Sequence, residues 1–260
     1  LYSSAASDVY KRQEDNAMIL AIEEVRKSIN SRRPQTGKIR ILTFLTTLII
    51  ISLLGIFWLP NILVQHTSSL VYTEQRKQIG FRLIEHVSKL IGSNCSSDKE
   101  ISPLNKLSNR LFPNSGVTIY VFSDGIKTAT HIPGKFILLN RSVVEDFETP
   151  EVVAGYLIIE KLKSDTNDPI EKLLSHVGTR AVLKFLTTGR LDDVTLEQYA
   201  KHILSIEPIS PSIDQIVSEF ESTEVNLEPY AYAVDITGES NADLIKNNNI
   251  LKSRQILNNQ

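Results

Sequence analysis

Few side chains in this 260-residue chain have the type and spacing that catalysis or metal binding requires. Its five histidines never lie three to five positions apart, so no histidine pair can hold a metal ion from adjacent helical turns. Cys95 is the only cysteine, which excludes an intramolecular disulfide and a cysteine-based zinc site. Ser175 and His176 are adjacent, and adjacent residues of a helix do not face each other. His131 lies at a predicted strand end, in a turn that we expect to be exposed, and is typical of a structural histidine.

Two nearby stretches carry a family resemblance. Residues 128–140 read TATHIPGKFILLN and residues 151–157 read EVVAGYL. They resemble the M48 family of membrane-associated zinc metallopeptidases, in which a Pro-Gly turn leads to a substrate-binding edge strand and a short helix precedes the active-site helix. The resemblance extends over residues 73–205. It implies an α+β, zincin-like domain that is mostly helical around a small three-stranded sheet.

The positions that match the family's His-Glu-x-x-His motif read Ile159-Glu160-Lys161-Leu162-Lys163. Only the glutamate, the general-base position in the family, is retained. Isoleucine has no lone pair, and a lysine at neutral pH is a cation without one, so neither side chain can bind Zn²⁺. This chain therefore lacks the two histidine ligands that the zinc chemistry of the family requires.

The third zinc ligand of the family is a glutamate in a Glu-x-x-Ala-Asp pattern on a later helix. The nearest match here is Glu197, but Lys201 stands where the aspartate would be. The resemblance therefore implies no metal, no other cofactor and no catalytic residue beyond a vestigial Glu160. We expect Glu160 to pair with Lys163, three positions later, in an ion pair worth at most ~0.5 kcal/mol if it is exposed.

The same resemblance implies a binding surface. The strand after the Pro-Gly turn corresponds to the family's edge strand and comprises Lys135, Phe136, Ile137, Leu138 and Leu139. An exposed strand edge can bind an extended segment of a partner protein by β-augmentation. We therefore expect a protein partner of the cell envelope to bind along these residues.

An uncharged segment predicts a membrane anchor. Residues 41–59 contain no charged side chain, and a helix of about 20 apolar residues crosses the roughly 30 Å hydrocarbon core. Six basic and no acidic residues lie between Arg26 and Arg40. The positive-inside rule then keeps the N-terminus in the cytoplasm. With the resemblance, this predicts a single-pass protein of the bacterial inner membrane, in contact with the lipid bilayer through residues 41–60, with a periplasmic domain.

The sequence divides into five predicted parts. Residues 1–13 resemble a translated adapter and are expected to be a sequencing artefact, residues 14–40 form a basic cytoplasmic segment, and residues 41–60 form the transmembrane helix. The extracytoplasmic domain covers residues 73–240, and residues 241–260 form a flexible tail. The net charge of −2 argues against a nucleic-acid partner.

Periodicity places secondary structure within the domain. Apolar residues at helical spacing predict helices over residues 73–91, 104–111, 150–163, 169–188, 195–204 and 211–220. Apolar and β-branched runs predict a three-stranded meander over residues 117–122, 126–130 and 135–139, and a further short strand over residues 230–236. Thr149 and Asp168, each before a proline, are typical helix starts, and Gly92 and Gly189 are typical helix ends.

These features favour a membrane-anchored, extracytoplasmic, pseudopeptidase-like module that binds or scaffolds a partner in the envelope. Two alternatives stay open. One is an active envelope metallopeptidase that uses unrecognised ligands. The other is an inert structural or oligomerisation module.

Overall fold

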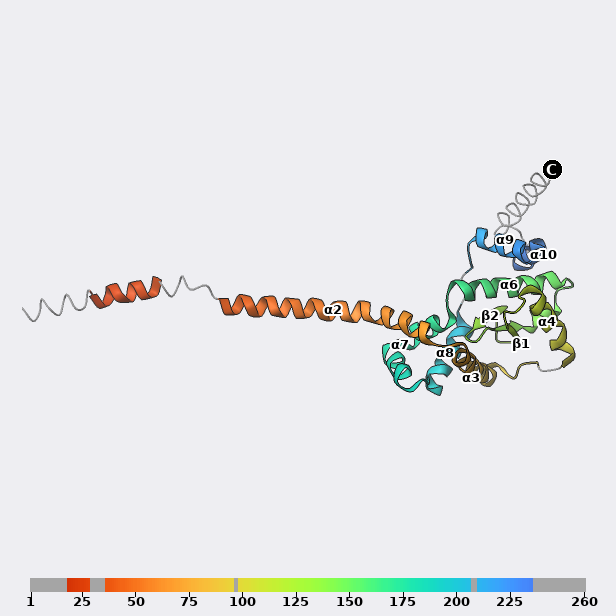
Figure 1. Cartoon of the computed structure of the whole chain (residues 1–260), viewed down its shortest axis with the longest axis horizontal. Helices are drawn as coiled ribbons and strands as arrows, with labels where there is room; N and C mark the ends of the chain where they lie inside the picture. Colours follow the sequence, from red (N-terminus) through yellow and green to blue (C-terminus); the bar gives the residue numbers. More distant parts are fainter. Residues whose placement is uncertain (1–17, 29–35, 96–97, 207–209, 236–260) are drawn as a thin grey trace, which may run out of the picture. The chain divides into compact units, whose positions relative to one another are not determined.

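A computed structural model describes residues 18–28, 36–95, 98–206 and 210–235 (Figure 1). The chain divides into two compact units, Leu1–Phe57 and Trp58–Gln260. The predicted artefact at residues 1–13 and the predicted tail at residues 241–260 both lie outside the described residues.

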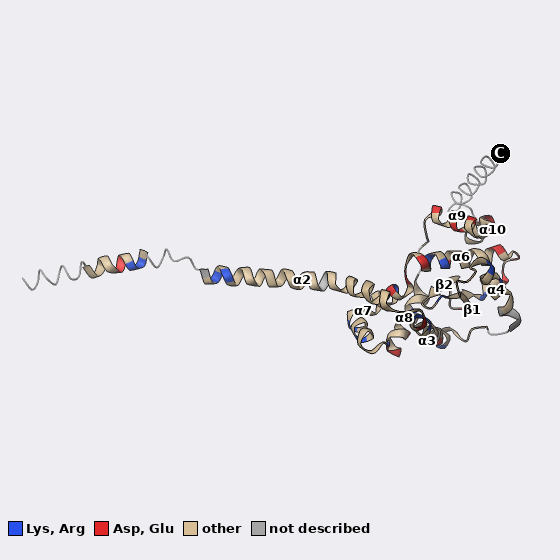
Figure 2. Ribbon diagram, in the orientation of Figure 1, with Lys and Arg blue, Asp and Glu red and all other residues tan. Residues whose placement is uncertain are grey.

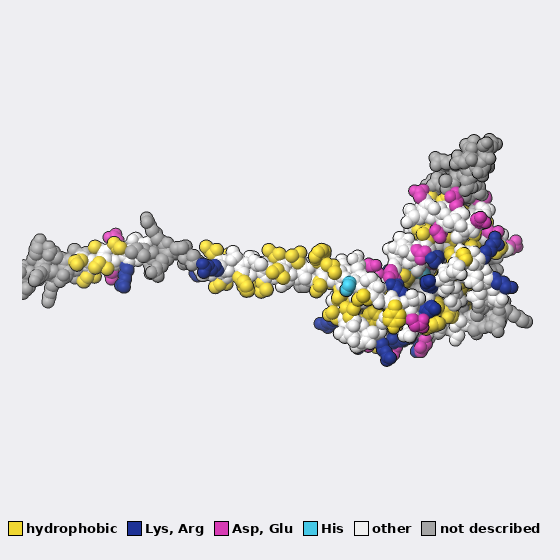
Figure 3. All heavy atoms as spheres, viewed as in Figure 1, with side chains coloured by type: hydrophobic (Ala, Val, Ile, Leu, Met, Phe, Trp, Pro, Cys, Tyr) yellow, Lys and Arg dark blue, Asp and Glu magenta, His cyan; other side chains and the backbone are white. Residues whose placement is uncertain are grey.

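A long apolar helix begins in the first unit and ends in the second. Helix α2 runs from Thr36 to Leu70, and its segment Gly37–Leu70 has the length and composition to cross a membrane; its most apolar 18-residue window has a mean hydropathy of 2.4. None of its most apolar window is buried against other parts of the chain, and many hydrophobic side chains are visible along its surface (Figure 3). Figure 2 shows basic residues only at the start of this helix.

Polar side chains within this helix are satisfied by the helix itself. The hydroxyl of Thr43 donates to the carbonyl oxygen of Arg40 at 2.9 Å, and those of Thr46 and Thr47 donate to the carbonyl oxygen of Thr43 at 2.9 and 2.8 Å. Such bonds remove the cost of placing a hydroxyl in an apolar environment. The threonines therefore do not interrupt the apolar character of the segment.

The second unit is mostly helical around a three-stranded sheet. The strands are β1 (Thr118–Phe122), β2 (Ala129–Ile132) and β3 (Phe136–Asn140), in the order β1-β3-β2. Strand β3 pairs in parallel with β1 and antiparallel with β2. The predicted meander is therefore wrong, because β3 lies between the two earlier strands and is not an edge strand.

Helices cover both faces of this sheet. Alternate strand residues such as Ile119 and Ile137 join a hydrophobic cluster with α4 (Asp98–Leu111), α6 (Pro150–Thr166), α9 (Ile213–Ser222) and α10 (Leu227–Val234). Their neighbours, including Phe122 and Leu138, join a second cluster with α3 (Thr73–Ile91), α7 (Pro169–Thr188) and α8 (Asp193–Ser205). Figure 1 shows α6 and α3 on opposite sides of the strands. Because successive side chains of a strand point to opposite faces of the sheet, the same strands contribute to two separate hydrophobic cores.

Helix ends follow the predicted local chemistry. Thr149 is the N-cap of α6, with Pro150 in its first turn, and the side chain of Asp168 accepts a hydrogen bond from the Ile170 N–H at the start of α7. Gly92 and Gly189 end α3 and α7 at positive φ of 98° and 69°. These four predictions are confirmed. The short helix α5 (Arg141–Glu145) follows β3 directly.

The predicted strand over residues 230–236 is wrong, because the residues from Leu227 to Val234 form helix α10. Its buried residues are Leu227, Tyr230 and Ala231, at helical spacing, whereas Tyr232 and Val234 are about half exposed. The ring of Tyr230 packs edge-on against Tyr156 of α6, with ring centroids 5.2 Å apart. Burial of one helical face therefore outweighs the β-propensity of the alternating residues.

Candidate functional site

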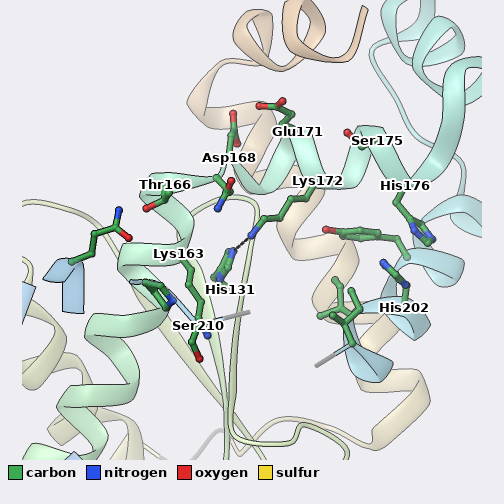
Figure 4. Close-up of a pocket in the computed structure, with 16 residues that line it drawn as sticks. His131, Lys163, Thr166, Asp168, Glu171, Lys172, Ser175, His176, His202 and Ser210 are labelled. Atoms are coloured by element: carbon green, nitrogen blue, oxygen red, sulfur yellow. Dashed lines mark hydrogen bonds between the residues drawn. The ribbon is translucent and has the colours of Figure 1, made fainter. Parts of the chain in front are cut away.

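One groove of about 710 Å³ opens within the second unit (Figure 4). Its walls come from β2, the C-terminal end of α6, the first half of α7, α8 and the start of α9. The polar residues that line it include His131, Lys163, Thr166, Asn167, Asp168, Glu171, Lys172, Ser175, His176, Tyr199, His202, Ser210 and Gln215. Ile203, Ile206 and Pro211 add an apolar wall. The groove thus combines a few charged groups with apolar surface, as ligand sites commonly do.

A buried carboxylate lies behind the groove wall. The side chain of Glu160 on α6 is only 5% exposed. One carboxylate oxygen accepts from Lys163 Nζ at 2.7 Å, and the other accepts from His131 Nδ1 at 2.7 Å. On the far side of the ring, His131 Nε2 lies 3.2 Å from Lys172 Nζ. Because one ring nitrogen faces a carboxylate and the other an ammonium, the proton resides on Nδ1 and Nε2 accepts.

This arrangement corrects two expectations. His131 lies on β2 with a side chain that is 10% exposed, and not in an exposed turn. Glu160 and Lys163 do pair, as predicted, but they do so in a nearly buried setting. A buried pair has a much larger cost of disruption than an exposed one, since the remaining charge is left without its partner.

The environment shifts the pKa values of two groups in this network. Burial alone would raise the pKa of Glu160, but the hydrogen bond from His131 and the charge of Lys163 together outweigh it, so its pKa is lowered. Lys172 is an exposed residue whose ammonium is partly desolvated at the groove wall; this desolvation lowers its pKa, and the negative charge of Glu160 offsets the effect only in part. The network therefore holds Glu160 as a carboxylate, while the ammonium of Lys172 is incompletely solvated.

The side chains at this site do not fit zinc. Ile159 is a buried aliphatic residue of the hydrophobic core, and the ammonium of Lys163 donates to Glu160. Glu197, the candidate third ligand, does not line the groove and instead accepts from Lys201 at 2.6 Å on the surface. In the described part of the chain, no group of three or more His, Cys, Asp or Glu side chains is placed to hold a metal ion.

The predicted binding residues Lys135–Leu139 do not form an edge. Phe136, Ile137, Leu138 and Leu139 are at most 3% exposed, and β3 is paired on both sides. Their backbone groups are therefore engaged within the sheet. The Nζ atom of Lys135 donates to the carbonyl oxygen of Ser115 at 2.6 Å. The strand that reaches the groove is β2, an outer strand of the sheet, through His131.

A second histidine arrangement also lines the groove. The rings of His176 on α7 and His202 on α8 stack with centroids 3.8 Å apart and an interplanar angle of 19°. Tyr199 lies beside them, 5.5 Å from His176 between centroids. Burial, followed by the proximity of His202, lowers the pKa of His176. Sequence spacing offered no signal for this pair, because the two residues are 26 positions apart on different helices.

Comparison with known protein families and with curated proteins found no match. No model of a known protein family matches this chain, and no curated protein is significantly similar to it in sequence. The M48 resemblance therefore depends on the residues quoted above.

Proposed function

We propose that this chain is a membrane-anchored, extracytoplasmic binding module of the cell envelope, with an M48-like domain that does not perform zinc peptidase chemistry. The observation that carries the proposal is the engagement of Glu160. Peptide hydrolysis by this family's chemistry needs a metal to activate water and a free carboxylate to accept its proton. Here both carboxylate oxygens of Glu160 already accept hydrogen bonds, from Lys163 and His131.

The groove supports binding as the retained activity. Its volume of about 710 Å³ lies within the range of roughly 300–1,000 Å³ that is typical of ligand sites. The partner that we propose is an extended polypeptide segment, as the M48 resemblance implies. It would occupy the groove beside β2 and not the strand Lys135–Leu139, whose edges are both paired.

Fluorescein-labelled β-casein, an extended polypeptide, tests this function with the full-length protein in detergent micelles. We expect its anisotropy to rise with protein concentration and the labelled casein to stay intact on gels. Ser175→Trp, which places an indole in the groove, should weaken binding at least tenfold, because the groove volume is reduced. Thr187→Trp, on the same helix but outside the groove lining, is the matched control and should bind as the wild type does.

Three results would contradict the proposal. Cleavage of casein that a chelator abolishes would favour an active metallopeptidase. No binding at all would favour an inert structural module. Equal weakening by Ser175→Trp and Thr187→Trp would show that casein binds elsewhere on the protein.

The membrane part of the proposal rests on the exposed apolar helix α2 and on the basic residues that precede it. We expect alkaline phosphatase fused after Gln260 to be active, because this enzyme folds only outside the cytoplasm. Green fluorescent protein at the same position should be dark after Sec-dependent export, since it does not mature in that compartment. A fluorescent fusion combined with inactive phosphatase would reverse the proposed orientation.

A further inference from the structure

We infer that Lys172 is the anchor for a ligand carboxylate, specifically the C-terminal carboxylate of a polypeptide whose last side chains lie on the apolar wall of the groove. This inference rests on the proposed function, in that it assumes the groove to be the binding site. It adds the chemical group that the site recognises and the residue that recognises it.

Among the described residues around the groove, Lys172 is a cation without an acidic partner in an ion pair. Lys163 is neutralised by Glu160. Asp168 forms a two-point ion pair with Arg76, with N–O distances of 2.5 and 2.7 Å, and also caps α7. Among the ion pairs of the described residues, none includes Lys172.

The side chain of Lys172 points into the groove. Figure 4 shows Lys172 extending from α7 toward His131, whereas the carboxylate of Glu171 leaves the same helix in the opposite direction. The only hydrogen-bond partner of Lys172 among the described residues is the neutral Nε2 atom of His131. An ammonium has three N–H donors, so two donors remain for a ligand.

The hydrogen-bond network fixes the position of this ammonium. Glu160 holds the His131 ring by its Nδ1 atom, so the Nε2 lone pair points at Lys172. Although Lys172 is exposed as a residue, partial desolvation of its ammonium at the groove wall lowers its pKa, so the charge lacks part of the hydration that it would have in water. A carboxylate that binds there restores a favourable environment for that charge.

A carboxylate fits this site better than a phosphate does. A phosphate group carries up to two charges and usually binds to several donors, such as arginine forks or free helix N-terminal amides. The described residues that line the groove include no arginine, and the Ile170 amide at the start of α7 already donates to Asp168. One ammonium beside Ile203, Ile206 and Pro211 matches a single negative charge attached to an apolar chain end.

A pair of peptide pools tests the inference. Both pools contain fluorescein-labelled octapeptides of random sequence that end in leucine, valine or phenylalanine, and they differ only in a free or an amidated C-terminus. With full-length protein in micelles, we expect the free-acid pool to bind about tenfold more tightly, the size of one charge-assisted hydrogen bond. Lys172→Met should remove this difference, and Lys172→Arg should retain part of it.

The matched control is Lys184→Met, which removes an exposed lysine of α7 that pairs with Asp192 outside the groove. It should keep the tenfold preference. Equal binding of both pools to the wild-type protein would overturn the carboxylate inference while the casein result still supports the proposed function. Loss of the preference in both methionine variants would also overturn it. The acid–amide comparison on the wild type needs no variant, so misfolding of Lys172→Met cannot hide the answer.

Discussion

Replacing Glu160 with glutamine should lower the free energy of unfolding by about 3 kcal/mol, the lower end of the cost of breaking a buried ion pair. The substitution keeps the shape of the side chain but removes its charge. Lys163, whose side chain is 13% exposed, would then lack its partner, and the His131 N–H would face a weaker acceptor. An exposed pair would cost only ~0.5 kcal/mol, so the size of the loss distinguishes the two settings.

Urea unfolding of the full-length protein in micelles, followed by circular dichroism, measures this loss. Glu197→Gln is the matched control, because Glu197 forms an exposed pair with Lys201 on α8. It should change stability by less than about 0.5 kcal/mol. The double variant Glu160→Gln with Lys163→Met should recover much of the loss, since Lys163 then no longer leaves a buried charge without its partner. Equal effects of Glu160→Gln and Glu197→Gln would show that the buried network contributes nothing.

The pH dependence of stability gives an independent readout of the same network. The pKa of Glu160 is lower in the folded protein than its ordinary value. Its contribution is therefore complete above the ordinary carboxyl pKa of about 4.3 and is lost as the pH falls through the lower folded value. We expect Glu160→Gln to lose stability less steeply than the wild type over this acidic range. Parallel acid profiles would contradict the lowered pKa.

Replacing Gly80 with alanine should destabilise the protein by about 2–3 kcal/mol, although the same change usually stabilises a helix by roughly 0.5–1 kcal/mol. A Cβ atom at this position of α3 would clash with the carbonyl oxygen of Pro133 and would lie 2.5 Å from the ring of Phe136. The carbonyl belongs to the turn between β2 and β3. The Pro133 carbonyl cannot move away unless β2 and β3 also move. Relieving the clash therefore distorts the sheet at its central strand, β3.

The same urea titration measures this effect. Gln78→Ala, an exposed site two residues earlier on α3, is the control and should stay within about 0.5 kcal/mol of the wild type. The sign of the Gly80→Ala change decides the outcome. A gain in stability would show that α3 does not pack closely enough on the turn for a Cβ atom to clash with the Pro133 carbonyl.

Local chemistry explains which features were predictable from the sequence. Thr149 with Pro150, Asp168 with Pro169, and Gly189 specify helix ends through groups within a few residues of each other, and these predictions hold. The lack of zinc-ligand chemistry at Ile159 and Lys163 likewise depends only on residue type. The apolar character of residues 41–59 is also a property of the sequence alone.

The position of β3 in the sheet was only partly predictable from the sequence. The run Phe136-Ile137-Leu138-Leu139 is apolar at every position, which indicates a strand buried on both faces. An edge strand with one exposed face would alternate. The signal for a central strand was therefore present, but the parallel pairing with β1 was not, because the paired residues are 18 positions apart and no local pattern encodes their register.

Only the tertiary structure assembled the candidate site. His131 lies 29 positions from Glu160 and 41 from Lys172, and β2, α6 and α7 must pack together before these side chains meet. A sequence records which groups can ionise or donate. The partial desolvation that lowers the pKa of Lys172, and the distances that link it through His131 to Glu160, arise only when separate elements pack against one another.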